Sequence, residues 1–144
     1  MKRLLAVVLF VTLLISFAGV ASAADWQFIT SDDEASAFFD TQSFTGDKNS
    51  KTYTVWIKWQ PSEDYIKEFA KRYKKDISYV LIKNQYDSIN KKMRFLNFTF
   101  YDVNSEIAAS NTEQTPWEDI IPKSHGGKVF NATYAYYKEH YLKD

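Results

Sequence analysis

The chain contains no cysteine, and glycine and proline are scarce, with 4 and 3 copies in 144 residues. Without cysteine there is no disulfide bond, no thiolate zinc site and no cysteine nucleophile. The scarcity of glycine and proline, beside a hydrophobic share of 45%, excludes a disordered or low-complexity chain. An excess of charge of one sign is also lacking, because 18 basic residues balance 18 acidic ones. A near-neutral chain has no overall field to attract nucleic acid.

Aromatic residues are abundant instead, with 4 Trp, 10 Tyr and 11 Phe. A chain of this length forms one domain that buries roughly two thirds of its unfolded surface. We interpret the aromatic side chains as the filling of a thin core between two layers rather than as the lining of a ligand pocket.

The first 23 residues are typical of an export signal. Lys2 and Arg3 precede an apolar run at residues 4–18, and small residues follow up to Ala23. We expect cleavage between Ala23 and Ala24, which leaves residues 24–144 as a single domain. Without the two basic residues of the signal, 16 basic side chains face 18 acidic ones, a net charge of −2.

The alternative for this segment is an uncleaved membrane anchor, since residues 4–23 just reach the length of about 20 residues that a spanning helix needs. The small residues before Ala24 and the polar Asp25 after it favour cleavage. Because no cysteine follows the apolar run, the protein is not a lipoprotein. The sequence therefore predicts a secreted or periplasmic protein with no membrane span after processing.

Alternation of apolar and polar residues predicts antiparallel strands in the rest of the chain. In the clearest strand, residues 51–60, Tyr53, Val55 and Ile57 face one side together with Trp59, while Trp56 faces the other. The other expected strands cover residues 26–29, 37–40, 77–86, 93–102 and 106–110. The remaining stretches between strands, residues 41–50 and 117–122, are expected to be a loop and an irregular segment.

Two helices are expected. A middle helix begins after Ser62, a suitable N-cap, and carries acids in its first turn. A terminal helix runs from Ser124, also a suitable N-cap, to Leu142, with an aromatic stripe of Phe130, Tyr134, Tyr137 and Tyr141. The predicted fold is α+β: an antiparallel meander sheet of about six strands, with a middle helix and a C-terminal helix packed across the sheet.

The order of several short motifs resembles a known family. Trp26 opens the domain, Phe39 and Asp40 close the second strand, and Tyr86 and Asp87 precede a basic stretch. The other motifs are Val55-Trp56-Ile57-Lys58, Lys91-Lys92-Met93-Arg94, and Trp117 ahead of Ile120-Ile121-Pro122-Lys123-Ser124. This order resembles the surface-adhesin E family of small exported bacterial domains, over nearly all of residues 25–135.

The resemblance implies an antiparallel sheet crossed by a C-terminal helix, and binding to host matrix and serum proteins, with a homodimer as a possible assembly. Many members carry one cysteine after the aspartate of the fourth strand and a second in the terminal helix. Here Ser88 follows Asp87, and the helix has no cysteine, so aromatic packing must hold the helix on the sheet. The fold transfers more readily than the function.

Catalytic and metal-binding patterns are weak, and the chain is not expected to be an enzyme or to bind a cofactor. Ser124 and His125 are sequence neighbours, which is not the geometry of a nucleophile and its base. The acidic run from Asp32 to Glu34 lacks the spacing of a calcium loop and is expected to be a solvated turn. Asp40 and Asp87 could meet as a carboxylate pair, although caps at strand ends are favoured.

Binding features are more visible. The middle helix is basic along one side, through Lys67, Lys71, Arg72, Lys74 and Lys75. This side is either a solvated face or a docking surface for an acidic protein or an anionic polymer. Trp56 lies either under the terminal helix or at the surface as an aromatic anchor.

Three functional hypotheses follow. The first is an extracytoplasmic, non-enzymatic binding module of the adhesin E type that engages a protein or polymer partner and no nucleic acid. The second is a small structural or envelope-stress protein that acts by self-association. The third is a hydrolase based on paired carboxylates.

Overall fold

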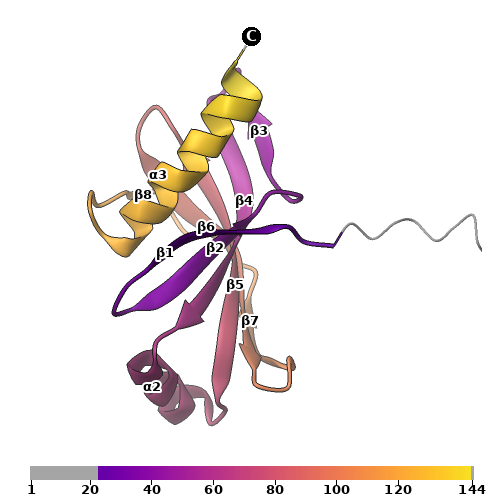
Figure 1. Ribbon diagram of the computed structural model, residues 1–144, viewed down its shortest axis with the longest axis vertical. Coiled ribbons are helices and arrows are strands. Elements are labelled where there is room, and N and C mark those ends of the chain that lie inside the picture. Colours follow the sequence, from indigo (N-terminus) through magenta and orange to yellow (C-terminus); the bar gives the residue numbers. More distant parts are fainter. Residues whose placement is uncertain (1–22, 144) are drawn as a thin grey trace, which may run out of the picture.

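Strands with alternating buried and exposed side chains form one antiparallel sheet in the computed structural model, which describes residues 23–143 (Figure 1). The strands are β1 Trp26–Ser31, β2 Ala35–Asp40, β3 Thr45–Asp47, β4 Thr52–Pro61, β5 Ile77–Asp87, β6 Lys92–Asp102, β7 Ile107–Asn111 and β8 Glu118–Asp119. The helices are α2 Glu63–Tyr73 and α3 His125–Tyr137, which continues as a π-helical turn, η1 Lys138–Leu142. The predicted α+β fold with a middle and a C-terminal helix is confirmed.

The sheet has the order β1-β2-β4-β5-β6-β7, so that the six principal strands follow one another as a meander. The two short strands pair at its margins, β3 with β4 and β8 with β6. The expectation of a loop at residues 41–50 and of irregular structure at 117–122 was wrong at these two strands. Strands of three and two residues are too short to show an alternating pattern.

Both helices lie on the same face of the sheet, which we call the helix-bearing face (Figure 1). Tyr53, Val55 and Ile57 of β4 point to this face and are almost completely buried. Their neighbours in sequence point to the opposite side, which we call the open face because no helix of residues 23–143 covers it. The alternation predicted for β4 is thereby confirmed.

The terminal helix is held by its aromatic stripe. Phe130 and Tyr137 are buried, and the Tyr137 hydroxyl donates to the backbone carbonyl of Asp47 at 2.7 Å. One turn later, the Tyr141 hydroxyl donates to the carbonyl of Phe44 at 2.8 Å. Aromatic packing and these bonds to the chain around β3 hold the helix on the sheet without a disulfide.

Gly46 in β3 allows this close approach. A Cβ atom at this position would lie 2.7 Å from Tyr137 Cε2 and 2.8 Å from Tyr141 Cδ1, which is far inside van der Waals contact. The glycine therefore lets the strand lie directly against the two rings. At the other end of the helix, the Ser124 side chain accepts a hydrogen bond from the Gly127 amide at 3.0 Å, which confirms Ser124 as the N-cap.

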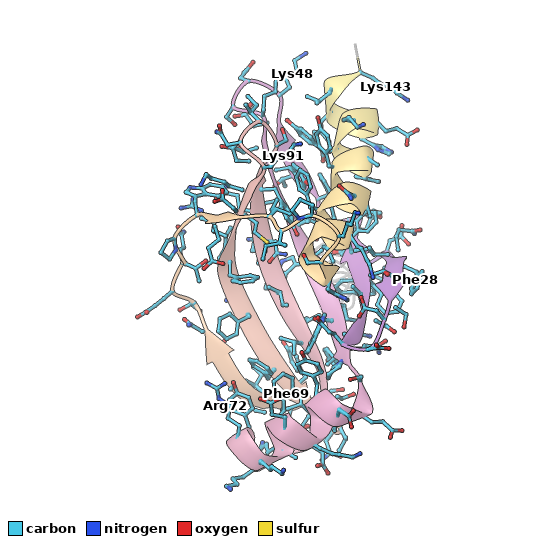
Figure 2. All side chains as sticks on the ribbon, turned by 90° about the vertical axis from the view of Figure 1, so that its left-hand side faces the viewer. Phe28, Lys48, Phe69, Arg72, Lys91 and Lys143 are labelled. Carbon is cyan, nitrogen blue, oxygen red and sulfur yellow. The ribbon has the colours of Figure 1, made fainter. Side chains whose placement is uncertain are left out.

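The middle helix packs against the far end of the helix-bearing face. Phe69 points from α2 toward the sheet (Figure 2), and its ring contacts Trp59 of β4 and Phe100 of β6. Ser62 occupies the N-cap position, but its side chain makes no capping bond. No residue of α2 is buried, so α2 packs less extensively on the sheet than α3 does. No helix within residues 23–143 is long and apolar enough to cross a membrane.

Candidate binding surface

The open face combines cations with aromatic rings. Lys58 Nζ lies 5.0 Å from the centre of the Tyr79 ring, and Lys83 Nζ lies 5.8 Å from the Trp56 ring. At the edge of this face, the Arg94 guanidinium lies 4.6 Å from the ring of Trp117. We call these three pairs the cation–aromatic surface. The strand register places the three cations on adjacent strands: Lys58 on β4, Lys83 on β5 and Arg94 on β6.

Trp56 lies in this surface and not under the terminal helix. The helix covers the Tyr53 side of β4, whereas Trp56, an odd number of residues away, points to the open face and is half-buried. Of the two alternatives for Trp56, the position under the terminal helix is therefore wrong, because α3 packs on the side of the sheet that carries Tyr53 and Tyr86. Trp56 is left with the role of a surface aromatic residue.

The three cations of the surface have no acidic partner. Lys58, Lys83 and Arg94 form no ion pair with any residue in the described range 23–143. Arg94 is oriented by a hydrogen bond from its Nε to Gln85 Oε1 at 2.8 Å. Their charges are therefore available to an acidic partner, and the guanidinium is oriented before binding.

The outward positions of β4, β5 and β6 carry one carboxylate, Asp87, at the hairpin end. Hydrogen bonds from the amides of Asn90 and Ile89 and from the Asn90 side chain hold the pKa of Asp87 below its usual range. This carboxylate is engaged by its own turn. It therefore leaves the positive character of the cation–aromatic surface largely intact.

The basic residues of the middle helix lie at a different place. Lys67 pairs with Asp64 at 3.6 Å, and Lys75 pairs with Asp102 at 3.5 Å. The other three, Lys71, Arg72 and Lys74, are exposed. Because α2 packs on the helix-bearing face, the structure does not bring these side chains together with Trp56.

The paired carboxylates of the hydrolase hypothesis are each committed to a turn. Asp40 Oδ1 accepts from the amides of Asp25 at 2.8 Å and Gln42 at 3.1 Å. Asp87 serves the turn after β5 in the same way. Within residues 23–143 no group of three side chains is placed to hold a metal ion.

The acidic turn is arranged otherwise than expected, whereas Ser124 takes the expected role of a helix cap. Asp32 is not simply solvated: Lys128 Nζ lies 2.9 Å from its Oδ2, and His125 Nδ1 lies 3.0 Å from the same atom. The Lys128 ammonium and His125 hold the pKa of Asp32 well below its ordinary value, against a smaller opposing effect of burial. Ser124 is engaged as the helix cap, so it is not paired with His125 as a nucleophile.

Sequence reasoning found Trp56 but missed the cations beside it. Lys58 and Arg94 were visible only as parts of longer motifs, and Lys83 was not singled out. Their common signal is the strand period: once Trp56 is assigned to one face, every second residue of β4 joins it, including Lys58. The pairing register, which sets Trp56 opposite Lys83, is the information that the sequence lacks.

Comparison with protein families gave a match to this chain. Residues 26–133, well over half of the chain, match the family described as surface-adhesin protein E. Comparisons with curated proteins and with solved structures gave no significant match. The family supports a surface adhesin-like role. The chain belongs to the surface-adhesin protein E family.

Proposed function

We propose that the protein is an exported, non-enzymatic binding module whose cation–aromatic surface engages an acidic protein or an anionic polymer. The observation that carries this proposal is the set of three cations without acidic partners, each resting on an aromatic ring of the open face. A cation held against a ring is worth roughly 0.5–1 kcal/mol at an exposed site. This is enough to bias the side chain toward one position without removing its charge from solvent.

Such an arrangement suits recognition of carboxylate, sulfate or phosphate groups. The rings of Trp56 and Tyr79 offer apolar contact area beside the charges, and aromatic residues with arginine are typical of energetically important interface positions. The basic side of α2, with Lys71, Arg72 and Lys74, offers a second, weaker candidate on the other face. It lacks rings that order its charges, apart from Arg72 over Tyr73 at 5.6 Å.

Binding to immobilised heparin and to polyglutamate, measured at several salt concentrations, tests the proposal. We expect the variant Lys58→Gln/Lys83→Gln/Arg94→Gln to bind at least tenfold more weakly, with a smaller dependence on salt. The matched control, Lys71→Gln/Arg72→Gln/Lys74→Gln, removes the same number of charges from α2 and should lose less affinity. Equal losses in the two variants would show that only net charge matters, and no binding by the wild type would reject the proposal.

Export of the protein is part of the same proposal. The basic start, the apolar run and the small residues before Ala24 support a cleaved signal at residues 1–23; all but Ala23 of this segment lies outside the described residues. Mass spectrometry of the protein recovered from the periplasm or medium should find an N-terminus at Ala24. A full-length, membrane-bound product would contradict it. Sedimentation of the same material tests the alternative of self-association, which predicts a dimer at micromolar concentration.

A further inference from the structure

An apolar groove crosses the helix-bearing face between the two helices. The strands between α2 and α3 are visible in Figure 2, on the side that faces the viewer. Half-buried side chains from three strands and α2 line a volume of about 260 Å³, and no polar residue takes part. We call it the aromatic groove; it is lined mainly by Trp59, Phe69, Ile82, Phe95, Phe98 and Phe100.

The groove continues toward α3 into a smaller pocket of about 140 Å³. The two spaces share Trp59, Ile82 and Phe95, so they are adjacent. The smaller pocket is bounded by the first residues of α3 and adds two polar side chains, Asn84 and His125, to walls that are otherwise mostly apolar. An apolar channel thus ends at a small polar site.

Each of these two polar side chains has one buried atom without a hydrogen-bond partner among residues 23–143. Asn84 is only 4% exposed; its Nδ2 donates to the Tyr86 hydroxyl at 2.8 Å, and its Oδ1 has no partner. His125 has 11% of its side chain exposed, and its Nε2 has no partner. Buried polar atoms in folded proteins are almost always paired, so two such atoms in one pocket indicate a place for a ligand group.

The contact of His125 with Asp32 fixes the proton on one ring nitrogen. Nδ1 lies 3.0 Å from Asp32 Oδ2, and because a carboxylate accepts, Nδ1 carries the proton. Asn84 Oδ1 is an acceptor, and Nε2 is the second polar atom open to a ligand group. The charge of Asp32 is already engaged by Lys128 at 2.9 Å.

We infer that the aromatic groove and the pocket beside it bind a single-chain amphiphile whose uncharged head group carries hydrogen-bond donors. The apolar chain lies in the groove, and the head group donates to Asn84 Oδ1 beside His125 Nε2. An anionic head would meet the acceptor Asn84 Oδ1, and a cationic head would enter apolar walls with no free counter-charge. A protein partner fits less well, because both unpaired polar atoms are buried and not on the surface.

Titration of the mature protein with 1-decanol, followed by NMR shifts of the Trp59 indole and the Asn84 side-chain amide, tests this inference. We expect saturable binding, at least tenfold tighter than that of decanoate or decylammonium, which have the same chain length. Equal or tighter binding of decanoate would overturn the assignment of the head group. Absence of saturable shifts with all three probes would overturn the site itself.

Two variants sharpen the test. Asn84→Leu keeps a similar volume and removes the unpaired acceptor together with the bond to Tyr86. We expect it to fold with a lower melting temperature, to bind decanol about tenfold more weakly and to prefer decanol over decylammonium by a smaller factor. Trp56→Phe, on the same strand but on the open face, should leave decanol binding unchanged. If Asn84→Leu matched the wild type in affinity and preference, the amide would have no part in binding, and the inference would fail.

This inference is independent of the proposed function, and the variants separate the two. The open-face variant Lys58→Gln/Lys83→Gln/Arg94→Gln should lose heparin binding and keep decanol binding. Loss of decanol binding in that variant, with its melting temperature unchanged, would contradict a separate site on the helix-bearing face.

Discussion

Both faces of the sheet carry aromatic side chains, but these have different surroundings on the two faces. On the helix-bearing face Tyr53 stacks on Tyr86 at 4.9 Å and on Tyr137 at 4.8 Å between ring centres, and all three are excluded from water. On the open face the aromatic rings instead carry cations, as in the pair of Lys83 and Trp56. Aromatic content alone therefore does not distinguish a core from a binding surface. The two are distinguished by the charges beside the rings and by the presence of a covering helix.

Loss of a ring should be costly on the helix-bearing face and cheap on the other. Phe130→Ala empties a site that is 6% exposed and contacts Tyr86, and it should lower the free energy of unfolding by roughly 3–5 kcal/mol. The matched control is Phe28→Ala on the open face, where the side chain is 61% exposed; we expect a loss below about 1 kcal/mol. Urea denaturation of both variants measures the two losses in free energy of unfolding. Equal losses would contradict the view that only the helix-bearing face forms the core.

A glycine substitution tests the contact that holds α3. Gly46→Ala places a methyl group 2.7 Å from Tyr137 Cε2, so the ring or the strand must shift, and we expect a loss of roughly 1–3 kcal/mol. Gly126→Ala in α3 is the control. Its nearest neighbour would be Ser124 Oγ at 3.8 Å, and an alanine in a helix should stabilise by roughly 0.5–1 kcal/mol. Thermal unfolding would contradict this account if both changes had the same sign.

An electrostatic contact joins α3 to the first hairpin, and its loss should have a smaller, pH-dependent effect. The pKa of Asp32 is lowered in the folded protein, so its contribution to stability is full above the ordinary value of 3.8 and declines as the pH falls below it. We expect Asp32→Asn to lower the melting temperature by a few degrees at pH 7, and by less as the pH falls below that value. Asp33→Asn, which changes its exposed neighbour, should show little effect at either pH.

The smallest effect on stability is expected from the cation–aromatic surface. Removal of its three charges by Lys58→Gln/Lys83→Gln/Arg94→Gln should change the free energy of unfolding by less than about 1 kcal/mol, because the groups are partly solvated. A loss of several kcal/mol in urea denaturation would mean that the open face contributes to the fold. Its proposed role in binding would then need another test.

The main features of the helix-bearing face could be predicted from the sequence. The buried side of each element follows from its apolar period. Tyr53, Val55 and Ile57 recur with the period of a strand, and Phe130, Tyr134 and Tyr137 recur with the period of a helix. The packing of α3 on the sheet also follows, because exposure of either apolar side to water is unfavourable. The α+β fold therefore rests on local patterns.

The functional features depend on contacts between distant residues, which one sequence does not reveal. Asp32 and His125 are separated by 93 positions, and the ring that they orient leaves Nε2 without a partner among residues 23–143. Trp56 was assigned to the correct side of its strand, but the side that α3 would cover could not be decided from the pattern of β4. The register that places Lys83 opposite Trp56 is likewise set by the paired strands together.

The hold of α3 on β3 also has a consequence for the order in which the molecule can assemble. Tyr141 bonds to Phe44 across 97 positions, and Tyr53 contacts Thr133 across 80. Because α3 follows every strand in the chain, the strands can pair during synthesis while their richest aromatic face is still without its cover. Contacts so distant in sequence are slow to form, and uncovered apolar strands are prone to aggregate. The interval before residues 125–142 join the sheet is thus the stage at which aggregation is most expected.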